Sequence, residues 1–385
     1  MSYALPMTKI RPFTLAVPQD QLDDLARRLA AARWPEKEPV GDWSQGVPLA
    51  DLQVLVAYWR EGYDWRKCET RLNGLGQFVT ELDGIDIHFL HVRSPHEAAT
   101  PLILTHGWPG SVIEFLNCIG PLTDPLAHGG KAEDAFHVVV PSLPGYGFSA
   151  KPDRAGWNVE RIARAWAVLM DRLGYARWFA QGGDWGAIVT TAIGSQAPTG
   201  LAGIHVNMPL AQRRKEDFVD PGPEAQAAIA AGEHYQRYES GYSAQQRTRP
   251  QTIGYSLVDS PVGLAAWIYE KMMTWTDNAG RPEDALSRDT ILDNIMLYWL
   301  TASGASAARL YWESFGGLAA PAQVKLPAGV SNFPKEISKS PREWAARTYN
   351  DLVYWSDVAK GGHFAAWEQP ELFVAELRKC FALMR

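Results

Sequence analysis

The feature that most constrains the fold is the run Gly182-Gly183-Asp184-Trp185-Gly186. Its small-x-nucleophile-x-small spacing is that of a nucleophile elbow, a sharp strand-to-helix turn that lifts the central side chain out of a sheet. Only small flanking residues let the backbone turn that tightly. An apolar run at 177–181 and a helix-compatible stretch at 187–197 supply the strand and the helix. Taken alone, the five residues fit a glycine-rich turn or a helix cap at Asp184 better.

An aspartate at the centre of an elbow changes the expected chemistry. A serine there would form an ester on its hydroxyl group, whereas a carboxylate attacks a saturated carbon and becomes the acyl half of the ester. The substrate must then carry a leaving group on an alkyl carbon, as an epoxide or an alkyl halide does. The chain holds no Gly-x-Ser-x-Gly run that would compete with Asp184.

The surrounding sequence alternates between apolar strands and helices. Strands are expected at 77–82, 85–92, 101–105, 137–141, 177–184 and 202–208, and helices at 18–34, 48–61 and 158–173. The two strands joined by Asp83-Gly84 should form a hairpin. From about residue 100 the alternation, with functional loops at strand ends, predicts a mostly parallel, doubly wound α/β sheet.

The alternation stops at Pro209, and the next hundred residues are helical and aromatic. Strand patterns return near Val330 and at 353–359, and a last helix is expected at 371–383. We therefore expect an N-terminal meander with the first strands (1–95), a first core part (96–208), a helical lid (209–320) and a second core part (321–385). A lid fits the need to bury a covalent intermediate away from bulk water.

The composition and net charge limit the classes of partner that the chain is expected to bind. The 385 residues carry 37 basic and 43 acidic side chains, a net charge of −6, which argues against a nucleic acid or an acidic membrane surface. Residues 1–18 lack an apolar stretch long enough for a signal peptide or a membrane anchor. Three scattered cysteines fit neither a disulfide framework nor a metal site, and they favour the reducing cytoplasm.

An aspartyl ester needs a base to hydrolyse it, and a histidine oriented by a carboxylate is the expected solution. The chain order nucleophile, acid, histidine points to His363, the only late histidine, which follows two glycines at a strand end. Two candidate acids precede it, Glu336 and Asp357. Asp357 sits inside the strand that leads to His363, so Glu336, 27 residues earlier, is the chosen acid.

The run His106-Gly107-Trp108-Pro109 falls where such folds place an oxyanion-hole loop. The backbone N–H groups of Trp108 and Trp185 are the expected donors, and they would stabilise the charge that forms when water attacks the Asp184 carboxyl carbon. We interpret His106 as a structural residue that braces the turn.

Opening an epoxide also requires a proton donor, and a phenol stays protonated at neutral pH. The lid region holds seven tyrosines among which this reasoning does not choose: Tyr235, Tyr238, Tyr242, Tyr255, Tyr269, Tyr298 and Tyr311.

Along nearly its whole length the chain resembles the microsomal-type epoxide hydrolases of the α/β-hydrolase superfamily. The resemblance rests on these runs, in order: Pro12-Phe13 to Pro35, Tyr63-Asp64-Trp65-Arg66, His106 to Ser111, Gly182 to Gly186, Asp259 to Trp267 and Gly361 to Ala366. It implies Asp184 as nucleophile, Glu336 and His363 as its triad partners, and Tyr242 and Tyr311 as proton donors. Tyr311 is the firmer match, because Tyr242 lies in a more variable loop.

The expected function is hydrolysis of a small apolar epoxide, with an aromatic group favoured by the lid, to a vicinal diol without cofactor or metal. The alternatives are a haloalkane-type dehalogenase with the same nucleophile and a non-catalytic binding protein that uses the lid pocket. The physiological epoxide, a role in detoxification or secondary metabolism, and assembly as a homodimer stay open.

Overall fold

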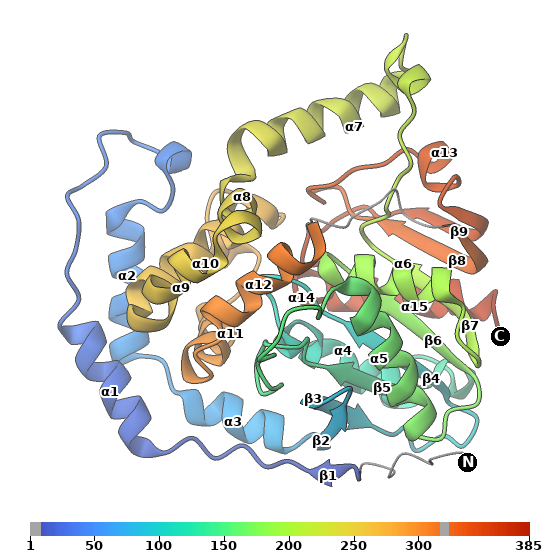
Figure 1. Ribbon diagram of the computed structural model, residues 1–385, viewed down its shortest axis with the longest axis horizontal. Helices are drawn as coiled ribbons and strands as arrows, with labels where there is room; N and C mark the ends of the chain where they lie inside the picture. The colour runs from blue at the N-terminus through green and yellow to red at the C-terminus, as the bar shows by residue number, and fades with distance from the viewer. Residues whose placement is uncertain (1–8, 316–322) are drawn as a thin grey trace.

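A mostly parallel sheet forms the centre of the fold (Figure 1). The computed structural model describes residues 9–315 and 323–385, and within them the strand order is β1-β2-β3-β5-β4-β6-β7-β8-β9. The strands are β1 (Arg11–Pro12), β2 (Gln77–Leu82), β3 (Ile85–Val92), β4 (Thr100–Thr105), β5 (Phe136–Pro141), β6 (Trp178–Gly182), β7 (Leu201–Val206), β8 (Val324–Asn332) and β9 (Tyr349–Asp357). From β5 to β9 all neighbouring strands are parallel, whereas β1, β2 and β3 pair antiparallel. The predicted doubly wound sheet is thereby confirmed.

Helices cover both faces of this sheet. The helices are α1 (Gln19–Ala30), α2 (Leu49–Glu61), α3 (Trp65–Asn73), α4 (Leu116–Thr123), α5 (Val159–Arg172), α6 (Trp185–Gln196), α7 (Pro223–His234), α8 (Gly241–Thr248), α9 (Pro250–Asp259), α10 (Pro261–Trp275), α11 (Arg288–Leu300), α12 (Gly304–Phe315), α13 (Arg342–Ala345), α14 (Ala365–Glu368) and α15 (Pro370–Ala382). Helices α5 and α6 pack together on one face, and α4 packs with α15 on the other (Figure 1).

Most expected elements form within a few residues of their predicted ends. The hairpin turns through Asp83 and Gly84, both with positive φ, as the Asp-Gly pair predicts. The strand expected at 177–184 ends at Gly182, so Asp184 lies in the turn and not in the strand. Helix α3 and the full length of β8 were not predicted, because Pro327 and Gly329 interrupt the β8 pattern.

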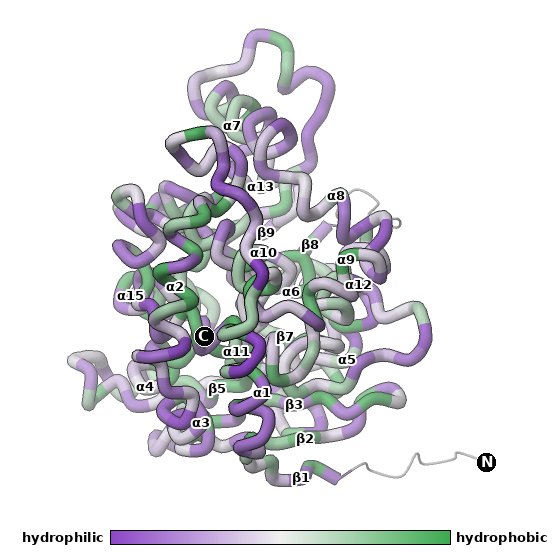
Figure 2. The backbone as a smooth tube through the Cα atoms, turned by 90° about the vertical axis from the view of Figure 1, so that its left-hand side faces the viewer, coloured by the Kyte–Doolittle hydropathy of each residue, from purple (hydrophilic) through white to green (hydrophobic). Residues whose placement is uncertain are grey.

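The region predicted to form a lid contains helices α7 to α12 between β7 and β8, and α7 projects from the body (Figures 1 and 2). The predicted change from lid to second core part, between residues 320 and 321, lies outside the described residues. In residues 9–315 and 323–385 no helix is both long and apolar enough to cross a membrane.

Side-chain hydrogen bonds join the N-terminal region, residues 9–95, to helices α9 and α11. Tyr58 and Tyr63 donate to the carboxylates of Asp289 and Asp293 on α11, at 2.6 and 2.8 Å. Arg28 on α1 reaches the α9 carboxylate of Asp259 at 3.1 Å. The hydrogen bonds from Tyr58 and Tyr63 therefore hold α11, whose Asn294 and Tyr298 side chains in turn bind the oxyanion-hole loop.

Candidate active site

Asp184 occupies a strained turn between β6 and α6. Its φ of 50° and ψ of −127° are unusual for a residue with a side chain, and such strain is typical of functional sites. A Cβ atom on Gly182 would collide with the backbone of Gly186, and one on Gly186 would collide with the carbonyl oxygen of Thr105. The flanking glycines are thus required by close backbone approach, as the elbow spacing predicts.

The structure brings Asp184, His363 and Glu336 together. His363 Nδ1 lies 2.7 Å from Glu336 Oε1, and His363 Nε2 lies 3.2 Å from Asp184 Oδ2. All three come from loops at the carboxyl ends of β6, β8 and β9, which meet at one edge of the parallel sheet. The Glu336 carboxylate also accepts the N–H groups of Ile337 and Ser338, which fix its orientation toward the ring.

The alternative acid, Asp357, is placed elsewhere. It ends β9 beside Asn332, whose side-chain amide donates to it at 3.0 Å, and it is exposed to solvent. The choice of Glu336 from chain order agrees with this geometry.

The pKa of His363 results from opposing effects. Burial is the largest single effect and disfavours the charged ring. The carboxylates of Glu336 and Asp184 together outweigh burial, so the pKa of His363 lies well above its ordinary value. Loss of the Asp184 charge would remove part of that support and lower the pKa, so that more of the ring is in the neutral form that can accept a proton.

The oxyanion-hole loop contacts the nucleophile directly. The backbone N–H of Trp108 donates to Asp184 Oδ1 at 2.8 Å, and a Cβ atom on Gly107 would strike the same carboxylate. Trp185 is the first residue of α6, and its ring packs edge-on against Tyr311 at 4.8 Å. The hydrogen bond of Trp108 leaves Oδ2 as the oxygen that faces His363.

His106 has the expected structural place. Its ring lies between the Gly107 carbonyl, 2.9 Å from Nδ1, and the Leu143 N–H, which donates to Nε2 at 3.1 Å. Burial lowers the pKa of His106 to about 4, so the ring stays neutral and braces two loops.

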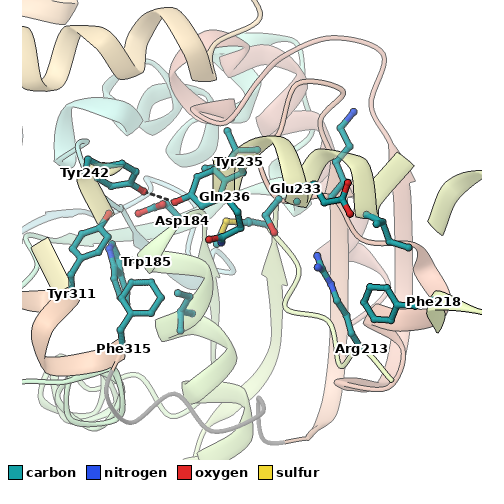
Figure 3. Close-up of a pocket in the computed structure, with 17 residues that line it drawn as sticks. Asp184, Trp185, Arg213, Phe218, Glu233, Tyr235, Gln236, Tyr242, Tyr311 and Phe315 are labelled. Carbon is teal, nitrogen blue, oxygen red and sulfur yellow. Dashed lines mark hydrogen bonds between the residues drawn. The ribbon is translucent and has the colours of Figure 1, made fainter. Parts of the chain in front are cut away.

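Of the seven lid tyrosines, three surround Asp184: Tyr235, Tyr242 and Tyr311 (Figure 3). The Tyr242 ring stacks on Trp108 at 4.6 Å and 7°, and it meets the Tyr311 ring edge-on at 5.7 Å. Burial holds the pKa of both phenols well above the ordinary value, so both keep their protons. Tyr235, which the sequence did not single out, hydrogen-bonds Tyr242 between their hydroxyl groups at 3.0 Å.

A cavity of about 440 Å³ opens in front of Asp184 (Figure 3). Aromatic rings of Trp185, Phe315 and the three tyrosines line the end near Asp184. Arg213, Phe218 and Glu233, the last a residue of α7, lie at the end of the cavity away from Asp184 (Figure 3). In the part of the chain that the structure describes, no group of His, Cys, Asp or Glu is placed to hold a metal ion.

Two further carboxylates near the site, Glu368 and Glu114, were not predicted from the sequence. Glu368 accepts the N–H groups of Gly362, Phe364 and Asp277 at 2.7–3.0 Å and thereby holds the loop that carries His363. Glu114 lies near Asp184 and His363. In the sequence it belongs to the pattern Ser111-x-x-Glu114, which is typical of a helix-capping box. Nothing in the local sequence separates either carboxylate from an ordinary structural one.

Comparison with known proteins gives consistent matches. The family described as "Epoxide hydrolase N terminus" matches residues 10–115, and "alpha/beta hydrolase fold" matches residues 100–252. A "Putative epoxide hydrolase" of Stigmatella aurantiaca is 60% identical over 98% of this chain and 86% of that protein. "Epoxide hydrolase 1" of Sus scrofa is 37% identical over 97% of this chain and 89% of that protein. The structure of the Aspergillus niger epoxide hydrolase is 34% identical, with a TM-score of 0.88 over 98% of this chain and 97% of that one.

Proposed function

This chain belongs to the microsomal-type epoxide hydrolases of the α/β-hydrolase fold and hydrolyses epoxides, and we propose that it does so through a covalent ester on Asp184. Of the three functions that the sequence left open, the dehalogenase and the non-catalytic binding protein find no support in these matches. The observation that carries the mechanism is the position of the Asp184 carboxylate between lid phenols on one side and His363 on the other.

In the first step Asp184 Oδ2 attacks an epoxide carbon, and the carbon–oxygen bond of the ring breaks. The developing alkoxide takes a proton from Tyr242 or Tyr311, which burial keeps protonated. Oδ1 is unsuited to attack, because the Trp108 N–H already binds it at 2.8 Å. The products of this step are a hydroxyalkyl ester of Asp184 and one tyrosinate.

In the second step water attacks Cγ of the ester and gives a proton to His363. The Trp108 N–H, and in our proposal that of Trp185, stabilise the oxyanion on Oδ1. The bond from Cγ to Oδ2 then breaks, and His363, 3.2 Å from Oδ2, protonates the departing diol. Asp184 returns its remaining proton to the tyrosinate, which restores the enzyme.

We propose small apolar epoxides with an aromatic substituent as substrates. The aromatic end of the cavity adjoins Asp184, so a flat ring next to the epoxide would be stacked and desolvated there. A panel of aryl, alkyl and cyclic epoxides checks this, because equal kcat/KM for the aryl and alkyl members would contradict it.

The covalent step is tested with His363→Gln and an active aryl epoxide. We expect an adduct of epoxide mass on Asp184 by intact-protein and peptide mass spectrometry, because the variant forms the ester but lacks the base. Asp184→Asn provides the matched control without an adduct. A single turnover of the wild-type enzyme in ¹⁸O-labelled water should label Asp184 and leave the first diol unlabelled, since Oδ2 leaves with the diol. Label in that first diol would instead show direct attack of water on the epoxide.

A cytoplasmic location is also proposed, because Cys68, Cys118 and Cys380 are all free thiols. Assembly as a homodimer stays a prediction.

A further inference from the structure

Asp184 lies in the walls of two different cavities. The larger one contains the proposed substrate site and is lined by the lid tyrosines. The smaller one lies on the core side, where its walls include Gly107, Asn207, Glu114 and His363. Asp184 lines both cavities, so a second reactant could approach its ester from the core side.

Glu114 is the titratable group lining the smaller cavity that the proposed mechanism does not use. It lies in the short 3₁₀ turn at Val112–Phe115, after the oxyanion-hole loop. The residue is partly buried, and its Oε1 atom is buried without a hydrogen-bond partner among residues 9–315 and 323–385, although hydrogen bonds from the backbone of Gly107 and Ser111 lower the pKa of the carboxyl group. Glycine at residue 110 leaves room for the carboxyl group in this position, since a Cβ atom there would overlap Oε1. An unpartnered buried carboxyl oxygen is costly and calls for a bound polar molecule.

A second buried polar atom without a partner faces the same cavity, and it becomes an acceptor in the ester, where loss of the Asp184 charge lowers the pKa of His363. Within the described part of the chain His363 Nε2 makes no hydrogen bond of good geometry, although it lies 3.2 Å from Asp184 Oδ2. The cavity leaves about 10 Å³ for the centre of a water molecule, which is room for one water. One water has two O–H groups, and these two acceptors would take both of them. A lone pair of the water is then free to point at Cγ of Asp184.

The charges of the site agree with this arrangement. Burial raises the pKa of Glu114 to about 8, an effect that the nearby His363 charge opposes and the Asp184 charge reinforces. A carboxyl group that is largely neutral near pH 7 still offers a carbonyl oxygen to a water O–H. It also places little negative charge next to Asp184, whose ester carbon the water must attack.

We propose that the small cavity holds the hydrolytic water and that Glu114 positions this water against His363 for attack on the Asp184 ester. The proposal rests on the covalent mechanism above. In the step itself the water oxygen bonds to Cγ, one water proton moves to His363 Nε2, and the hydrogen bond to Glu114 Oε1 keeps the other O–H in place. Glu114 neither gains nor loses a proton.

The test separates ester formation from ester hydrolysis in Glu114→Leu and Glu114→Gln. Rapid mixing with an aryl epoxide, followed by quenching and intact-protein mass spectrometry, measures both rates. In the leucine variant we expect ester formation within about threefold of wild type and hydrolysis slowed about 10- to 100-fold, as misplacement of a reactant predicts. The glutamine variant keeps a carbonyl oxygen, so its rate of ester hydrolysis should lie between those of the wild type and the leucine variant. With hydrolysis slowed until it limits turnover in the leucine variant, kcat and KM should fall together while kcat/KM stays nearly unchanged.

Glu376→Gln is the matched control, because Glu376 is a buried carboxylate that binds Ser331 and Tyr354 away from the cavity. It should leave both rates unchanged. Ester hydrolysis at the wild-type rate in the Glu114 variants, or equal slowing of both steps, would overturn the role of Glu114. If the leucine variant fails to fold, the glutamine variant decides by the same criterion. Absence of an adduct even in His363→Gln would instead contradict the covalent mechanism itself.

Discussion

The core side and the lid side of the active site are held in different ways. On the core side, hydrogen bonds of 2.7–2.8 Å join Asp184 to the Trp108 N–H and His363 to Glu336, and strand-end loops carry all of these groups. On the lid side the phenol of Tyr242 is held largely by ring packing, with Trp108 stacked on it and the Lys271 ammonium 4.8 Å from its centre. Directional bonds fix the core geometry, whereas ring packing tolerates small shifts of the lid.

This difference agrees with our proposal that the two sides of the site act in different steps of the reaction. The core side performs ester hydrolysis, which is the same for every substrate. The lid side protonates the opening epoxide, whose shape varies between substrates. Helix α11 connects the two sides, because Asn294 and Tyr298 donate to the carbonyl oxygens of Pro109 and Gly110 at 2.7 and 2.8 Å.

The largest effect is expected from Asp184→Asn, which removes the nucleophile shared by both sides. Activity should fall by about 10⁴-fold or more, because an amide neither attacks the epoxide nor forms the ester. Steady-state diol formation measures the loss, and an unchanged melting temperature shows that the fold persists. Residual activity within tenfold of wild type would remove Asp184 from the mechanism.

The next largest effect should come from the lid side alone. The double variant Tyr242→Phe/Tyr311→Phe should slow ester formation by about 10²- to 10⁴-fold, because no phenol remains in place to protonate the alkoxide. Ester hydrolysis should change far less, and no adduct should accumulate. Tyr255→Phe serves as control, since its side chain is exposed on α9. Accumulation of an ester in the double variant would refute the division between the two sides.

A pH effect should appear on the core side only. His363 must be neutral to accept a proton from water, so ester hydrolysis should rise with pH until the pKa of His363 in the ester is passed. Below that pKa each pH unit should cost about tenfold. Because the ester lacks the Asp184 charge, this pKa should lie below that of His363 in the free enzyme, which is raised well above its ordinary value. Single-turnover decay of the adduct and NMR titration of the free enzyme measure the two values, and the reverse order would contradict the charge argument.

The smallest effect is expected from Tyr235→Phe. This change removes one hydroxyl group bonded to Tyr242 at 3.0 Å, a hydrogen bond worth about 1 kcal/mol, so ester formation should slow roughly fivefold. Tyr238→Phe, on the same helical turn but 63% exposed, should have no effect. Equal rates in the two variants would show that Tyr235 contributes nothing to protonation.

Much of the fold and of the core side could be predicted because both depend on local backbone requirements. Gly182 and Gly186 are needed wherever the backbone makes this turn, so their spacing around Asp184 is visible in the sequence. The order of Asp184, Glu336 and His363 follows from the order of parallel strands, whose carboxyl ends meet at one edge. The residue pattern alone did not predict α3 or delimit β8.

The lid side was harder to predict from the residues, because several tyrosines have the same chemistry and only packing distinguishes them. Family resemblance selected Tyr242 and Tyr311, and the structure brings both beside Asp184 and adds Tyr235. Glu114 and Glu368 illustrate the same limit, since such a carboxylate is recognised by what surrounds it.

The sequence by itself determined the kind of chemistry: a carboxylate on a tight turn, with a histidine and an acid that follow in chain order. Only the tertiary structure decided which phenols and which further carboxylates adjoin that carboxylate, and that it lies between two cavities. The physical reason is the separation along the chain over which each kind of interaction acts. Backbone sterics act between neighbours in the chain, whereas burial, ring packing and cavity walls combine residues as distant in sequence as Glu114 and His363.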